Sequence, residues 1–318
     1  MAEDLFRRFK AAKAPSSPDD DDSGLEYRSQ AGVEKVREAE LMVAIDHVPA
    51  LPMVVRELMM RVGGENESID AIEDLMKQDM VLAGRLLKLV NSPFYALAQP
   101  VASISQALSI IGFASVKSLV LAASAAHLLA VDLACYGYQP MGLWRNSIAT
   151  AAIARSIAQR SGASADEAEE FFAAGLLRDV GILVLAPFVV KRCASLRRVS
   201  KGPTDILLLE RELIGYDHCW VGAKLAERWN LPQVLRLCIA SHHRIPVDIP
   251  PTLLRRLAAV RLAERLAYSA GVGVLPGHPF DAHVDGVLIH AAGLDSTLFE
   301  KLITQIPAIV KGAEIPLE

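Results

Sequence analysis

The chain has few cysteines, little net charge and no long uninterrupted apolar stretch, and each shortage excludes a class of protein. Its four cysteines include no CxxC pair and follow no secretory signal, so we expect buried thiols in a reducing compartment rather than a disulfide framework. The net charge of −4 gives no basic excess for nucleic-acid binding. The longest nearly apolar stretch, 119–131, is shorter than the roughly 20 residues of a membrane span. We therefore expect a cytoplasmic protein that binds neither nucleic acid nor membrane.

Strand patterns and the common catalytic motifs are also missing. No segment alternates apolar and polar residues over the length of a strand, and no repeat of roughly 20 to 50 residues is visible. The sequence contains no GxGxxG, GxxxxGK[ST], HExxH or GxSxG motif. Dinucleotide binding, P-loop chemistry, zinc proteolysis and a nucleophile elbow are therefore not predicted.

Signals of helix starts and helical periodicity fill the chain from about residue 33 onward. Asp79 precedes VLAGRLLKLV, in which Leu86 and Leu89 continue an apolar pattern of helical spacing. Ser103 and Ser164 each precede a Gln or Glu by three residues, which is the spacing of a capping box. These signals predict an all-α protein, with Leu86 and Leu89 in its core.

Helix ends and one ambiguous segment complete this pattern. Gly112, Gly162 and Gly271 stand where helices are expected to stop in a left-handed turn. The apolar run GILVLAPFVV (181–190) fits a buried strand or a buried helix. We interpret it as a helix interrupted at Pro187.

Residues 1–24 have the composition of a tail, which we expect to extend to residue 32. A short basic stretch is followed by a Pro/Ser spacer and the acidic run Asp19–Asp22, a combination that cannot pack a core. A solvated tail is favoured, and contact of the basic stretch with a partner or a membrane surface is the alternative.

Three motifs in the first half of the chain carry a family resemblance. They are VPALPMVVRELMMRV (48–62), DMVLAGRLLKLVNSPFY (79–95) and SISQALSIIGFASVKSLVLA (103–122). The markers are the LP pair before a helix, the aspartate before a leucine-rich helix, the NS pair closing that helix, and an Ala-x-x-x-x-Gly helix. In this order they resemble the HDOD family, the HD-related output domain of bacterial signalling proteins, over roughly residues 41–243.

The NS pair of this resemblance, Asn91 and Ser92, is followed by Pro93. Proline disfavours helical dihedrals at Ser92, and asparagine tolerates a left-handed position at a helix end. A structural helix stop is therefore favoured over a functional role for the pair.

The second half resembles the wider HD superfamily of metal-dependent phosphohydrolases. In active members a histidine, a His-Asp doublet and a distant aspartate converge on a metal that activates water. In LWRNSIATAAIARSIA (143–158) the first histidine is replaced by Asn146, and in GLLRDVGILVL (175–185) Arg178 replaces the doublet histidine while Asp179 is kept. In VRLAERLA (260–267), Glu264 stands where the last aspartate would lie.

Three further histidines resemble those of two-metal members: His218, His242 and His243. Successive helical residues diverge by about 100°, so the adjacent pair cannot direct both rings along one helical face. A structural or surface role is therefore favoured for that pair. For His127, in an Ala/Leu-rich helix, a buried core histidine is favoured over a ligand.

The replaced histidines decide the predicted chemistry. A guanidinium is always charged and has no lone pair for a metal, so Arg178 would repel the ion. We expect it to form an internal ion pair with Asp179 or Glu264 in place of the metal. The resemblance then implies a degenerate site that holds no metal or other cofactor and has no phosphohydrolase activity.

The resulting prediction is an N-terminal helical bundle (41–135) packed on a degenerate HD-like bundle (136–243), which C-terminal helices (244–318) complete. The expected function is that of a non-catalytic signal-transduction output or adaptor module. Its partner would be a signalling protein, a small nucleotide-like ligand bound through Arg178, or a second copy of the chain. The alternative is a divergent phosphohydrolase with a displaced metal at Asp179, His218, His242, His243 and Glu264.

Overall fold

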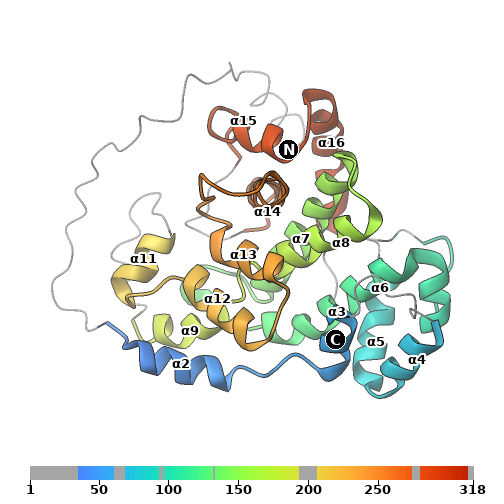
Figure 1. The fold of residues 1–318 in the computed structure, drawn as a ribbon, viewed down its shortest axis with the longest axis horizontal. Coiled ribbons are helices and arrows are strands. Elements are labelled where there is room, and N and C mark those ends of the chain that lie inside the picture. Colours follow the sequence, from blue (N-terminus) through green and yellow to red (C-terminus); the bar gives the residue numbers. More distant parts are fainter. Residues whose placement is uncertain are drawn as a thin grey trace.

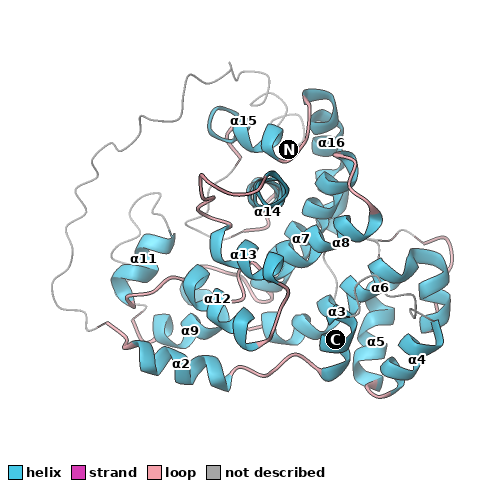
Figure 2. Cartoon of the chain, viewed as in Figure 1, coloured by secondary structure: helices cyan, strands magenta, loops and turns pink. Residues whose placement is uncertain are grey.

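The computed structural model describes residues 35–60, 69–92, 95, 97–131, 133–192, 206–273 and 280–313. Within these ranges the chain forms helices and connecting turns and contains no strand (Figure 2). The prediction of an all-α fold is therefore confirmed. The expected tail at residues 1–32 lies outside the described residues.

Fourteen α-helices and one short 3₁₀ helix follow one another through these ranges. They are α2 (Glu38–His47), α3 (Met53–Met60), α4 (Ile69–Lys77), α5 (Met80–Val90), α6 (Ile104–Leu129), η1 (Ala134–Tyr136), α7 (Gly142–Arg160), α8 (Ala165–Leu177), α9 (Ile182–Val190), α11 (Ile206–Leu213), α12 (His218–Arg228), α13 (Gln233–Ser241), α14 (Pro251–Ser269), α15 (Ala282–Ala291) and α16 (Ser296–Gly312).

The helices gather into two groups that share α6 (Figure 1). Helices α3, α4 and α5 pack against α6, and α6 also contacts α7 and α8 of the second group. Helix α7 is the centre of that second group and packs against α8, α14 and α16. Helix α2 was expected in the N-terminal bundle of residues 41–135, but it packs against α9 and α12 of the second group.

Local signals in the sequence place the helix starts. The Asp79 side chain accepts a hydrogen bond from the backbone N–H of Leu82 at the start of α5. At the start of α8, Ser164 and Glu167 form both bonds of a capping box. Each side chain thereby satisfies a backbone N–H that has no partner within its own helix.

Helix breaks are predicted less well than helix starts. Gly112 has the expected positive φ of 80°, but helix continues on both sides of it, so the glycine kinks α6. The segment 181–190 is helical as expected, yet α9 runs through Pro187 to Val190 without interruption. Asn91, at the end of α5, has a φ of −81°, so the expected left-handed conformation is wrong there.

Burial confirms the predicted core of the first group. Leu86 and Leu89 are almost wholly buried, as the periodicity of α5 predicts. In the second group α7 and α8 approach closely at Gly175, where a Cβ atom would lie 2.9 Å from the Cα of Ala151. The expectation of a buried His127 is wrong, because this side chain is exposed on α6.

Two segments are longer and more apolar than the stretch 119–131 suggested. Ile104–Leu129 and Ala165–Arg192 could cross a membrane by length and composition alone. However, 56% and 72% of their most apolar windows are buried inside the protein. Packing within the core accounts for this apolar composition, and the second segment contains α8, a turn and α9, so the two segments are weak evidence for a membrane span.

Candidate functional site

A tight turn between α8 and α9 carries the central residues of the site. Helix α8 ends at Leu177 and α9 begins at Ile182, which places Arg178 and Asp179 between two buried helices. A Cβ atom at Gly181 would lie 2.0 Å from the backbone oxygen of His218. Only glycine permits this approach, so Gly181 brings the turn against the start of α12.

Arg178 is wholly buried, and its guanidinium is surrounded by protein groups. It forms ion pairs with Asp179 (Nη2 to Oδ2, 2.8 Å) and Glu264 (Nε to Oε1, 3.5 Å). It also donates hydrogen bonds to the backbone oxygen of Gly175 at 2.8 Å and to the side-chain oxygen of Asn146. The expected ion pairing of Arg178 with Asp179 and Glu264 is thus confirmed.

The electrostatics of this pair follow from its partners. Burial opposes a charged guanidinium, but Asp179 and Glu264 outweigh burial and raise the pKa of Arg178 above its ordinary value. Burial likewise opposes a charged Asp179, but the guanidinium of Arg178, supported by His242, lowers the pKa of that carboxyl well below its usual range. Both groups are therefore charged at neutral pH.

Asn146 fills the space beside the guanidinium. Its side-chain oxygen accepts from Arg178, and its amide donates to the backbone oxygen of Val272 at 2.6 Å. The amide thus joins α7 to the end of α14. Both of its polar atoms are used in these contacts, which are structural.

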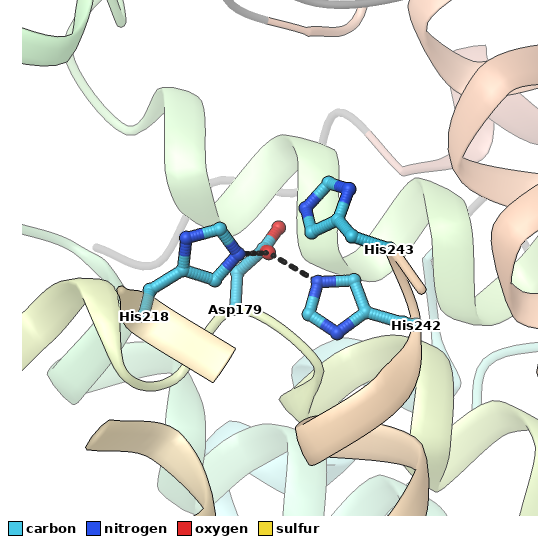
Figure 3. Close-up of side chains that lie close together, drawn as sticks. All are labelled: Asp179, His218, His242 and His243. Atoms are coloured by element: carbon cyan, nitrogen blue, oxygen red, sulfur yellow. Dashed lines mark hydrogen bonds and ion pairs between the residues drawn. The ribbon is translucent and has the colours of Figure 1, made fainter. Parts of the chain in front are cut away.

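The second oxygen of Asp179 faces two histidines. Oδ1 lies 3.2 Å from Nε2 of His242 and 3.5 Å from Nε2 of His218. His218 is the first residue of α12, and His242 follows directly after α13. Figure 3 shows these two rings and that of His243 gathered around the carboxylate of Asp179.

His218 is held from behind by a buried carboxylate. Its Nδ1 lies 2.7 Å from Oε2 of Glu210, which also accepts from the His218 backbone N–H at 2.8 Å. The other oxygen of Glu210 accepts from the hydroxyl of Tyr136 at 3.0 Å. Burial opposes a charged ring, but Glu210 outweighs burial and raises the pKa of His218 well above its ordinary value.

His242 has a different environment behind its ring. Nδ1 lies 3.0 Å from the backbone oxygen of Ile239 and 3.8 Å from the sulfur of Cys219. Burial opposes a charged ring, but Cys219 and Asp179 raise the pKa of His242 to about 10. Burial opposes a charged thiolate at Cys219, but His242 and His218 outweigh burial and lower the pKa of Cys219 to about 7.

The two adjacent histidines do not diverge as predicted. The rings of His242 and His243 have centroids 4.3 Å apart, and that of His243 lies 5.1 Å from the ring of His218. His242 follows the end of α13 and keeps helical dihedrals (φ −62°, ψ −27°), but the 100° spacing fixes only the direction of the Cα–Cβ bonds, and the rings turn towards each other about their side-chain torsions. Burial and the neighbouring histidines lower the pKa of His243 well below its ordinary value.

The expected site residues thus fall into two adjoining groups. Asn146, Arg178 and Glu264 lie together on one side of Asp179, and the three histidines lie on the other side. Glu210 and Tyr136 were missed. A signal existed for Glu210, because it occupies the apolar face of its helix between Leu207 and Leu213, where a carboxylate needs a partner.

The other predicted pair, Asn91 and Ser92, lies apart in the first group of helices. The amide of Asn91 donates to the backbone oxygen of Val101 at 2.8 Å and accepts from its N–H at 2.7 Å. The side chain closes the connection between α5 and α6. Ser92 is buried, and the structural role of the pair stays a prediction that the contacts of Asn91 support.

Comparisons with known proteins agree with this architecture. The HDOD domain family matches residues 48–245. The solved structure of an HDOD domain protein of unknown function from Geobacter sulfurreducens is 26% identical with a TM-score of 0.74, and the match covers 88% of this chain and 97% of that one. The fold is also that of a Marinobacter aquaeolei VT8 structure with the provisional name signal transduction protein. That structure has 23% identity, a TM-score of 0.67, and coverage of 99% of this chain and 65% of the other.

A sequence relative is longer than this chain. An uncharacterized protein of Treponema pallidum (strain Nichols) is 27% identical over 211 residues, which are 65% of this chain and 40% of the relative. The match therefore spans less than half of that relative. The family match covers more than half of the present chain and includes Asp179, His218 and the His242–His243 pair: the chain belongs to the HDOD family.

Proposed function

We propose that this HDOD protein is a non-catalytic output or adaptor module of signal transduction, acting in the cytoplasm by binding a signalling protein. The observation that carries the proposal is the place of Arg178. Its guanidinium is wholly buried between Asp179, Glu264 and Asn146. In the HD resemblance, these are the positions that surround a catalytic metal in active members.

The chemistry of this replacement supports an inactive centre. A metal-dependent phosphohydrolase needs an ion that lowers the pKa of a bound water. The guanidinium carries positive charge but has no empty orbital and does not deprotonate, so it cannot activate water in this way. Its contacts supply charge balance to the carboxylates and leave the centre without an ion at that position.

A nucleotide bound through Arg178 is disfavoured by the same contacts. A phosphate-binding arginine needs an accessible fork of N–H donors. Arg178 is 0% exposed, and it contacts Gly175, Asn146, Asp179 and Glu264. We therefore favour a protein partner, with a second copy of the chain as one form of it.

One observation favours the alternative of a divergent phosphohydrolase. The side chains of Asp179, His218, His242 and His243 lie close enough to hold an ion beside Arg178. Catalysis by such an ion would require a coordination position open to water and substrate. This alternative predicts hydrolysis that depends on both the metal and Asp179.

A hydrolysis assay tests the absence of catalysis. Full-length chain, purified without chelator, is supplied with manganese or zinc and offered bis(p-nitrophenyl) phosphate, nucleoside phosphates and cyclic dinucleotides. We expect no product beyond that formed by the metal alone. The matched control is Asp179→Asn. Turnover that requires added metal and disappears in Asp179→Asn would establish the alternative.

The binding half of the proposal needs its own measurement. The full-length chain is used as bait in its native host after mild cross-linking, and light scattering reports self-association. We expect one protein, or a second copy of the chain, in stoichiometric complex. A chain that is monomeric and without any stoichiometric partner under these conditions would contradict the proposal.

A further inference from the structure

Four side chains beside Arg178 converge on one point. Asp179, His218, His242 and His243 each offer a donor atom, and these atoms all lie within 4.8 Å of one another. The first three residues are buried, whereas His243 is only partly buried. Figure 3 shows the carboxylate and the three imidazoles around a common space. They come from the turn after α8, the start of α12 and the end of α13.

The hydrogen bonds behind two of the rings determine which nitrogen faces this space. Nδ1 of His242 lies against the carbonyl oxygen of Ile239, which can only accept, so Nδ1 donates its proton there. Nδ1 of His218 faces the carboxylate of Glu210, which also accepts from a backbone N–H. In the neutral rings, both Nε2 atoms therefore present lone pairs inward.

These two lone pairs face an acceptor. Nε2 of His218 and Nε2 of His242 lie 3.5 and 3.2 Å from the same oxygen of Asp179. Nε2 of His218 is buried and has no hydrogen-bond partner among the described residues. The lone pairs of the two ring nitrogens and those of the carboxylate oxygen repel one another unless a cation lies between them or the rings gain protons.

The charges around the site also favour a bound cation. Asp179, Glu210 and Glu264 are three carboxylates, and the described residues supply one arginine in ion pairs with them, Arg178. The two remaining negative charges are balanced either by protons on His218 and His242 or by a bound cation. A divalent ion supplies that charge while leaving the rings neutral, as metal ligation requires.

We propose that Asp179, His218, His242 and His243 bind one divalent transition-metal ion, with zinc as the best fit. Imidazole and carboxylate donors suit zinc, and the carboxylate behind His218 is the usual support of a metal-bound histidine. Zinc bonds of about 2.1 Å in a tetrahedron hold donors about 3.4 Å apart. The 3.2 and 3.5 Å separations at Asp179 lie near this spacing, and all four donor atoms lie within 4.8 Å of one another.

The geometry predicts a structural ion. Four protein donors would fill the coordination sphere of a four-coordinate ion and leave no position for water, which is typical of structural zinc sites. Asp179 then serves two cations, with Arg178 on Oδ2 and the ion on Oδ1. A bound ion would replace the metal-free site expected from the sequence, while Arg178 keeps its role and the site stays without catalysis.

Cobalt and zinc are the probes for this site. Full-length chain is stripped with a chelator, dialysed and titrated with cobalt, whose tetrahedral complexes absorb visible light, and then with zinc. We expect one equivalent of cobalt to bind with tetrahedral bands and zinc to displace it. Zinc should also raise the melting temperature, because an ion that binds only the folded chain stabilises it. Absence of saturable uptake would overturn the proposal.

Variants separate this site from surface binding. His243→Ala removes a partly buried donor, and we expect at least a tenfold loss of affinity with unchanged circular dichroism. His242→Gln serves as the second variant if His243→Ala fails to fold. His127→Ala, an exposed histidine on α6, is the matched control and should bind as the parent does. Equal affinity in the parent and in the folded His243 or His242 variant would overturn the proposal.

Discussion

At the scale of single residues, Asn91 is a family marker whose side chain closes a connection between two helices. Its amide satisfies both backbone groups of Val101, ten residues further along the chain. These contacts hold the start of the connection between α5 and α6. The sequence predicted the helix stop at this point, but not the bond to Val101, since no local pattern specifies a partner that far away.

Replacing Asn91 tests this structural role. Asn91→Ala removes two hydrogen bonds and should lower the free energy of unfolding by about 1 to 3 kcal/mol. Denaturant titration with circular dichroism measures the change. The exposed Gln99 lies in the same connection, and Gln99→Ala should remain within about 0.5 kcal/mol of the parent. Equal stability of the two variants would show that Asn91 has no such role.

Other site residues show the limit of prediction from sequence. Asn146, Arg178 and Glu264 were found by matching positions to a known motif, and their contact follows from the shared fold. His242 and His243 were misjudged because helical spacing fixes the direction of their Cα–Cβ bonds but not the side-chain torsions that orient the rings. Glu210 was missed because its partner, His218, belongs to a different helix.

At the scale of helices, glycine determines how closely α9 approaches α12. A Cβ atom on Gly181 would lie 2.0 Å from the backbone oxygen of His218 and 2.6 Å from the backbone nitrogen of Gly222. Backbone atoms cannot rotate away as a flexible side chain can. This contact brings Asp179 to His218, so the site depends on the packing of two helices.

Gly181→Ala therefore tests the packing of α9 on α12. The clash should destabilise the chain by about 1 to 3 kcal/mol or more, measured by denaturant unfolding. Gly84→Ala is the matched control, because Gly84 lies within α5 with no atom within 4 Å of an added Cβ. That change should stabilise the chain by about 0.5 to 1 kcal/mol. Changes of the same sign at both positions would contradict this account of the contact.

Helix α5 offers a second test at this scale. Leu86 and Leu89 are almost wholly buried, so each change to alanine should lower the free energy of unfolding by about 2 to 5 kcal/mol through lost burial and a cavity. Exposed Val81, on the same helix, is the control, and Val81→Ala should be nearly neutral. Two near-neutral leucine variants would mean that the buried face of α5 is assigned wrongly.

At the scale of the whole molecule, composition predicts the fold class but not the arrangement of the helices. Apolar periodicity and caps predict an all-α chain because they depend on residues close in sequence. The place of α2 against α9 and α12 depends on contacts across more than 130 residues. No local signal predicts such contacts, and for that reason α2 was assigned to the wrong group.

The N-terminal segment gives a prediction that rests on composition alone. Residues 1–24 lack the periodic apolar positions of a packed helix, so their removal should leave the melting temperature unchanged. Differential scanning calorimetry of the full-length and shortened chains measures it. A fall of more than about 5 °C, which corresponds to 1 kcal/mol or more in a chain of this size, would contradict the prediction.

The central claim is that Arg178 replaces a metal as the cation of the buried carboxylates. Its most direct test is a double-mutant cycle on the unfolding of the whole chain, with Arg178→Met, Asp179→Asn and both together, all in chelator. Arg145→Met, on the exposed side of α7, is the control.

Each single change should cost about 3 to 5 kcal/mol because it leaves its partner uncompensated. The double variant should be more stable than additivity predicts by about 1 to 3 kcal/mol. Additive effects within about 0.5 kcal/mol, or an Arg178→Met variant as stable as the control, would contradict the claim.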